Sequence, residues 1–361
     1  MVHAVCLKAK QIIYKTVSSK AARKQSTFRQ KKATQTNDNM KTIISLVFLI
    51  FFGTLTEAQI YYVQDMTTIE IEALDREKTI VLLPGGILEE HGPYLPSFSD
   101  GYMNEALTLE IANSIIKRPN WNVLIFPIIP LGTGGANEIG GKYSYSGTYA
   151  IRQNTLRAIF MDLGSELGEQ GFKMVFVIHI HGSANHNQAI DQAAEFFAET
   201  YHGRMINIWN LAFRFSPDLK NEEEKKEDGF GVHAGMNETS ILLYLKPETI
   251  KSEFKDAEPV TAYSSEGLVS KSKENGWQGY LGSPRLSSST FGEKYWKGWV
   301  NYIIDQVENI IDNKYDFSSP TFYEIELRDP AFNSFNKDAK KHERENEVRQ
   351  NEWLEKKGYD Q

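Results

Sequence analysis

Residues 79–86 read TIVLLPGG, an apolar run of strand length that ends in two glycines. The stretch KMVFVIHIHG at residues 173–182 has the same form. Strands that are apolar along their whole length are typical of a parallel sheet with helices on both faces, because neither face of such a strand meets water. We therefore predict an α/β fold with a mostly parallel central sheet.

Further segments continue the alternation of strand and helix. Strand-like runs stand at residues 121–132 and 204–210. Helix-like segments stand at residues 66–78, 100–117, 151–170 and 187–201, and the segment 238–247 fits either a helix or a strand. Ligands of parallel α/β sheets bind beyond the carboxyl ends of the strands, so the residues that follow each strand-like run are the first candidates for a site.

The charge of the chain is distributed unevenly. The 361 residues are 41% hydrophobic and 24% charged, which is ordinary for a globular protein of one large or two modest domains. Residues 1–58 hold 10 of the 40 lysines and arginines but only two of the 47 acidic residues, which leaves a net charge of -15 on the remainder. An acidic body of this kind argues against nucleic acid or an anionic membrane as a partner.

Residues 40–58, MKTIISLVFLIFFGTLTEA, have the layout of a secretory signal peptide, with Lys41 at the start and cleavage expected after Ala58. The apolar run at 43–52 is shorter than the roughly 20 residues that span a bilayer, so we expect a secreted or extracytoplasmic protein without stable membrane insertion after cleavage. An uncleaved anchor is the alternative. Residues 1–39 are basic and fit a disordered extension or a misassigned start, and a transit peptide or nucleic-acid-binding arm is the remaining alternative.

Acidic residues and a histidine follow the first strand-like run, in LPGGILEEHGPYLPSFSD at residues 83–100. Carboxylate oxygens and imidazole nitrogens are ligands that zinc, manganese and iron(II) accept. Glu89 and His91 are two positions apart, so in an extended segment their side chains leave on the same side. The stretch also fits a polar loop in which Asp100 only caps the next helix.

Two later stretches carry the same residue types. In HIHGSANHN at 179–187, His179 and His181 share one side of a strand, and His186 follows a turn. In GVHAGMNETS at 231–240, His233 and Glu238 precede an apolar element, where an N-capping cluster is the simpler interpretation.

These stretches resemble motifs of the creatininase (creatinine amidohydrolase) family. Five segments resemble family motifs in the same order: PGGILEEHGPYLPSFSD (84–100), PLGTGGANEIGGKYSYSGTY (130–149), HIHGSANHN (179–187), HAGMNETS (233–240) and GYLGSPRLSSSTFG (279–292). The resemblance implies a three-layer α/β/α fold and a metal-dependent amidohydrolase, often assembled into homo-oligomers. Members include cyclic-amide hydrolases, a formamidopyrimidine deformylase and a peptidase of mycofactocin maturation.

Position by position, the resemblance implies roles for particular residues. The metal-ligand positions of the family correspond to Glu89, His91, Asp100 and His181, and Glu238 is a further expected ligand. Asp100 would bridge two ions where two are present, and the ions would be zinc or manganese, or iron(II). His233 falls at a histidine that transfers protons, with His179 as the second candidate for this role.

The chain departs from the family pattern at several positions. Tyr94 stands where histidine is usual, Ser99 where threonine is usual and His179 where asparagine is common. Ser183 occupies the place of a glutamate that binds the second metal in creatininase. We therefore leave the second metal open, consider creatinine an unlikely substrate, and look to Tyr94 for a changed substrate. Glu90 falls at a variable position and is expected to point away.

We therefore predict a catalytic domain at 59–312 and a charged, helical, exposed tail at 313–361, with a solvated loop at 218–230. The expected reaction is metal-dependent hydrolysis of a C–N amide bond in a small molecule, whether a non-peptide (for example cyclic) amide, a formamide or a small peptide-like substrate. The alternative is a secreted, non-catalytic binding protein with the same fold.

Overall fold

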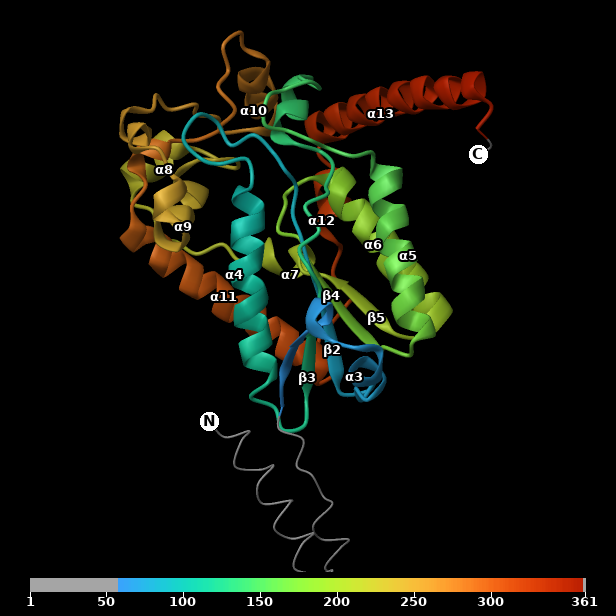
Figure 1. Ribbon diagram of the computed structural model, residues 1–361. Helices are drawn as coiled ribbons and strands as arrows, with labels where there is room; N and C mark the ends of the chain where they lie inside the picture. The colour runs from blue at the N-terminus through green and yellow to red at the C-terminus, as the bar shows by residue number, and fades with distance from the viewer. Residues whose placement is uncertain (1–57, 360–361) are drawn as a thin grey trace, which may run out of the picture. The chain divides into compact units, whose positions relative to one another are not determined.

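The computed structural model describes residues 58–359, and within them a single parallel sheet organises the chain (Figure 1). The strand order is β1-β3-β2-β4-β5, and every neighbouring pair is parallel. The strands are β1 (Ile60–Tyr62), β2 (Thr79–Pro84), β3 (Asn122–Ile125), β4 (Met174–Ile178) and β5 (Arg204–Asn207). The apolar run at 79–86 is the central strand, and the predicted parallel α/β fold is confirmed.

Helices cover both faces of the sheet, which explains why its central strands are apolar throughout. Along β2, Ile80 and Leu82 pack on one side, while Val81 and Leu83 pack on the other, as the alternation of a strand requires. The first side is covered by α4 (Ser99–Ile115) and α11 (Ser289–Ile311), and the second by α5 (Gln153–Glu169) and α6 (Ala184–Tyr201). The three-layer α/β/α architecture is therefore confirmed.

The remaining elements are short, apart from the last helix. They are η1 (Val63–Asp65), α3 (Thr68–Glu72), η2 (Ala136–Gly140), α7 (Trp209–Ala212), α8 (Glu222–Asp228), α9 (Met236–Leu245), η3 (Pro247–Thr249), η4 (Ser252–Asp256), α10 (Ser265–Lys273), η5 (Pro284–Leu286), α12 (Phe322–Glu326) and α13 (Pro330–Lys357). The ambiguous segment 238–247 thus lies mostly in a helix, α9. None of the helices among residues 58–359 has the length and apolar character to cross a membrane.

The loops after β2 and β4 are tied together by one buried side chain, that of Asn104 on α4. Its Nδ2 donates to the carbonyl of Gly85 (3.0 Å), and its Oδ1 accepts from the backbone N–H of Ile180 (2.9 Å). Because Asp100 begins the same helix, this side chain fixes three site-bearing segments relative to one another.

Two segments differ from the sequence-based expectation. The charged insertion at 218–230 is not only a solvated loop, because it contains α8. The last residue of this helix, Asp228, is fully buried. Asp228 accepts backbone hydrogen bonds from Met236 (3.0 Å) and Ser283 (2.6 Å), so it anchors the start of α9. The charged tail is helical, but it is not fully exposed: Asn336 and Ala339 are buried, and Glu343 accepts a hydrogen bond from Thr133. The signal peptide expected at 40–58, except Ala58, and residues 1–39 lie outside the described part of the chain.

Candidate metal centre

Glu89, Asp100 and His181 lie together beyond the carboxyl ends of β2 and β4. The Nδ1 atom of His181 is 3.2 Å from Oε2 of Glu89 and 3.1 Å from Oδ2 of Asp100. All three side chains are buried. One ligand atom from each residue lies within 4.8 Å of the other two, close enough for the triplet to hold one metal ion.

A second triplet shares Asp100 with the first and adds His91 and Glu238. Nε2 of His91 is 3.4 Å from Oδ1 of Asp100 and 3.9 Å from Oε2 of Glu238. Glu238 is in the first turn of α9, where its Oε2 accepts a hydrogen bond from the backbone N–H of Ala234 (2.6 Å). Asp100 thus presents one oxygen to each triplet. A carboxylate between two ligand sets is suited to bridge two metal ions.

Backbone carbonyls fix which ring nitrogen of each histidine faces the carboxylates. Nδ1 of His91 is 3.1 Å from the carbonyl oxygen of Glu89, and Nε2 of His181 is 3.1 Å from that of Gly134. Because a carbonyl oxygen only accepts, each of these nitrogens carries a proton and donates it. The other ring nitrogen of each histidine faces a carboxylate oxygen of Asp100. In a neutral ring this nitrogen is a hydrogen-bond acceptor, so two acceptors face each other. Two facing lone pairs require a cation between them, either a proton or a metal ion.

The excess of carboxylates changes the pKa values of this cluster. Burial opposes protonation of His181, but the charges of Glu89 and Asp100 outweigh it and hold the pKa of His181 well above its usual value. Burial also opposes ionisation of Asp100, yet the hydrogen bonds from His181 and His91 hold its pKa below the usual range. Burial raises the pKa of Glu238. The cluster therefore favours positive charge at its centre.

His233 borders the cluster on the side of Glu89, and with Glu89 and His91 it forms a third group whose ligand atoms lie within 4.8 Å of one another. Its Nε2–H donates to the carbonyl of Glu90 (2.7 Å), which leaves Nδ1 facing Oε1 of Glu89 at 3.9 Å. Despite burial, the charges of Glu89 and Glu90 raise the pKa of His233 to about 10. The backbone of Ala234 has a φ of 48°, a turn that sends the chain from His233 into α9. The ring of His233 lines the same cavity as Glu89, where a histidine can exchange a proton with a ligand.

His179, the second candidate for proton transfer, is placed apart from this cluster. Its ring is fully buried, packs edge-to-face on Phe160 at 5.1 Å and lies against the backbone of Gly85. Burial lowers the pKa of His179 to about 3. The ring does not line the cavity that the other candidates share.

One expectation about a neighbouring residue is wrong, and another gains no support from the structure. Glu90 does not point away from the site: it is buried, and its Oε2 is 3.6 Å from Nε2 of His233. Tyr94 packs against Tyr280, with ring centroids 6.0 Å apart, and is not among the residues that line the cavity. Tyr94 therefore makes no direct contact with this cavity, and its role in substrate choice stays a prediction.

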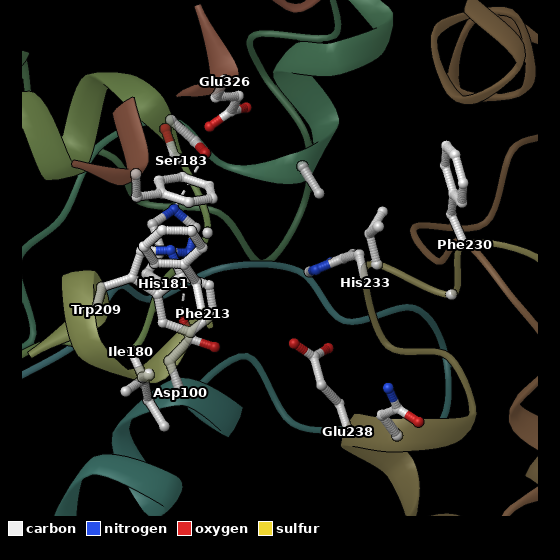
Figure 2. Close-up of a pocket in the computed structure, with 18 of the residues that line it drawn as sticks. Asp100, Ile180, His181, Ser183, Trp209, Phe213, Phe230, His233, Glu238 and Glu326 are labelled. Carbon is white, nitrogen blue, oxygen red and sulfur yellow. Dashed lines mark hydrogen bonds and ion pairs between the residues drawn. The ribbon is translucent and has the colours of Figure 1, made fainter. Parts of the chain in front are cut away.

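A cavity of about 540 Å³ opens onto the cluster (Figure 2). Figure 2 shows Asp100, His181, His233 and Glu238 around one space, with Trp209 and Phe213 beside it. Aromatic residues dominate the rest of the lining, which includes Trp209, Phe213, Phe215, Phe230, Tyr295, Trp299, Phe322, Phe332 and Phe335. The site therefore combines a polar, ligand-rich wall with apolar surroundings.

The family model described as creatinine amidohydrolase matches residues 64–307. This chain belongs to the creatininase family. Among solved structures, a mutant creatininase complexed with creatine matches with a TM-score of 0.54 and 22% identity, over 69% of this chain and 98% of that one. A putative creatinine amidohydrolase from Bacteroides fragilis matches with a TM-score of 0.50 and 20% identity, over 72% of this chain and 98% of that one.

Curated relatives of the chain are hydrolases with different substrates. A mycofactocin precursor peptide peptidase from Mycolicibacterium smegmatis is 23% identical over 63% of this chain and 84% of its own length. A 3-dehydro-scyllo-inosose hydrolase from Thermotoga maritima is 24% identical, over 64% and 73%. The creatinine amidohydrolase of Pseudomonas putida is 24% identical, over 52% and 73%. These relatives support a metal-dependent hydrolase and leave its substrate unspecified.

Proposed function

We propose that this protein is a secreted or extracytoplasmic hydrolase that uses one or two divalent metal ions to cleave a C–N amide bond. The observation that carries the proposal is the pair of histidines His91 and His181, whose carbonyl partners leave the other ring nitrogen of each facing Asp100. An arrangement of three carboxylates and two such nitrogens fits a metal ion better than a network of protein hydrogen bonds.

In this proposal Glu89, Asp100 and His181 hold the first ion, and His91, Asp100 and Glu238 hold the second. Glu238 would then replace, as a metal ligand, the glutamate that creatininase has at the position of Ser183. Zinc and manganese are the proposed ions, because solved creatininases include a Zn-Zn form and an Mn form; iron(II) accepts the same ligands. When bound, such ions polarise an amide carbonyl and lower the pKa of a water molecule.

The chain's own residues would orient and protonate the substrate. His233 keeps its Nε2 proton on the Glu90 carbonyl and presents Nδ1 toward Glu89 and the cavity. A proton carried on Nδ1 could pass to the leaving nitrogen as the C–N bond breaks. The aromatic lining would exclude part of the water around a bound amide, which strengthens these electrostatic contacts.

The test uses the chain from Gln59 onward, purified without added metal. Elemental analysis should find a divalent metal, and hydrolysis across a panel of lactams, formamides and dipeptides should vanish on chelation and return with zinc or manganese. Hydrolysis that is indifferent to chelation would contradict the proposal. Bound metal without any turnover across the panel would favour the non-catalytic binding protein. Amino-terminal sequencing of the secreted protein should begin at Gln59, and light scattering should report a homo-oligomer.

A further inference from the structure

The C-terminal extension, residues 313–359, closes one side of the cavity. These residues lie outside the segment 64–307 that the family model matches. Five of them line the cavity, and we call them the C-terminal wall: Phe322, Ile325, Glu326, Phe332 and Phe335. They come from α12, which lies beside α6 (Figure 1), and from the first turns of α13.

Polar contacts at both ends hold the C-terminal wall in place. Before α12, the backbone N–H of Phe322 donates to Oδ1 of Asn210 (2.9 Å), and Arg214 donates to the carbonyl of Pro320 (2.6 Å). On α13, Oε1 of Glu343 accepts from Oγ1 of Thr133 (2.9 Å) and from the backbone N–H of Gln153 (3.0 Å). The wall is thus anchored to loops of the catalytic domain.

The wall faces aromatic side chains of the catalytic domain. Phe322 packs edge-to-face on Trp209, with ring centroids 5.7 Å apart, and lies 5.3 Å from the ring of Phe213. Phe332 and Phe335 form a second edge-to-face pair at 5.6 Å. A cavity of about 540 Å³ with such a lining has the size and character of sites for ligands with a bulky apolar group.

Glu326 is the only charged residue of the C-terminal wall, and it is largely buried. Its Oε2 has no hydrogen-bond partner among the described residues. In Figure 2 the Glu326 side chain lies next to Ser183, at the start of α6 and on the side of the cavity that holds His181. A buried carboxyl oxygen without a partner is costly. Because this oxygen is almost completely covered, a small rotation of the Glu326 side chain toward the cavity would let a ligand supply the missing hydrogen bond.

We propose that the C-terminal wall selects the substrate: it admits amides that carry a bulky aromatic or branched apolar group, and Glu326 hydrogen-bonds to the polar part next to that group. This inference rests on the proposed amide hydrolysis, because only that reaction makes the bound molecule a substrate. The binding preference itself needs no metal. The wall therefore separates this chain from a hydrolase of small polar amides.

The test compares two amide probes that differ by one phenyl group, N-acetyl-phenylalanine amide and N-acetylglycine amide. Their affinities are measured by calorimetry on protein with and without its metal. The double variant Phe322→Ala/Phe335→Ala removes two of the three aromatic side chains of the C-terminal wall, and Glu326→Gln keeps the shape of the side chain while it removes the acid. Trp353→Ala is the matched control, because Trp353 stands exposed on α13 and does not line the cavity.

The wild type and Trp353→Ala should bind the phenyl probe at least about 10-fold more tightly than the glycine probe. The double variant should lose most of this preference, and Glu326→Gln should weaken both probes by a similar factor. If the double variant does not fold, Ile325→Trp fills the same cavity and should exclude only the phenyl probe.

Equal affinities of the two probes for the wild type, no binding of either, or an unchanged preference in the folded double variant would overturn the inference. If the purified protein shows this preference but contains no metal and hydrolyses no amide, the proposed function is contradicted and the inference about the C-terminal wall is retained. If the protein hydrolyses amides but shows no preference for the phenyl probe, the proposed function is retained and the inference about the C-terminal wall is refuted.

Discussion

The two triplets that share Asp100 make a stoichiometric prediction, because Glu238 belongs to only one of them. Glu238→Gln removes a ligand only from the triplet of His91, Asp100 and Glu238, while its amide oxygen can still accept the hydrogen bond from Ala234. Asp100→Asn removes the oxygen that each triplet shares. Loss of one ligand should lower the affinity for the metal ion at that site by at least about 100-fold, since even outer-sphere partners change metal affinity by about 10- to 100-fold.

We therefore expect about two metal ions per chain in the wild type, one in Glu238→Gln and fewer than one in Asp100→Asn. Mass-spectrometric elemental analysis after gel filtration measures these values. Glu110→Gln serves as the control, because Glu110 is exposed on the same helix as Asp100. Two ions retained in Asp100→Asn, or equal loss in both variants, would refute the assignment of Asp100 as the shared ligand.

Three further predictions concern other residues. His233→Asn should lower kcat by about 100-fold while the metal content stays unchanged, and a loss of metal would instead identify His233 as a ligand. Asp191 is buried, which raises its pKa from 3.8 to about 7, so the unfolded chain ionises first and stability should fall between about pH 4 and pH 7. Asp191→Asn should remove this loss and raise the free energy of unfolding at pH 7.5 by on the order of 1 kcal/mol, with no gain at pH 4, as chemical denaturation at both pH values would show. Gly85→Ala would place a Cβ only 1.8 Å from Nε2 of His179, so it should cost more than about 2 kcal/mol in the same assay; an unchanged midpoint would show that the ring can move aside.

The fold could be predicted from the sequence because its strongest signal is local. The run at 79–86 is apolar on both sides, and the structure shows why: alternate residues of β2 face two different cores. The same reasoning placed Glu89, Asp100 and His181 at one edge of the sheet, since each lies beyond or beside the end of a buried strand.

Other parts of the site depend on contacts that no local pattern records. The role of Asn104 could not be predicted, because an asparagine on a helix carries no sign that its amide joins the loops after β2 and β4. The C-terminal wall was hidden by composition: Phe322, Phe332 and Phe335 stand within a segment whose charge indicates a solvated helix. Their grouping near the start of the tail was the available signal.

The anchor at Glu343 also has a consequence for the order in which the protein is completed. Glu343 holds Thr133, and the next residue, Gly134, supplies the carbonyl that orients His181. A chain that stops at residue 312 would contain every side chain of the two triplets that share Asp100. It would lack the hydrogen bond from Thr133 to Glu343 that holds the loop containing Gly134. The chemistry encoded in the middle of the chain thus depends on a segment that is synthesised after it, so a product clipped before this segment is a poor guide to the intact protein.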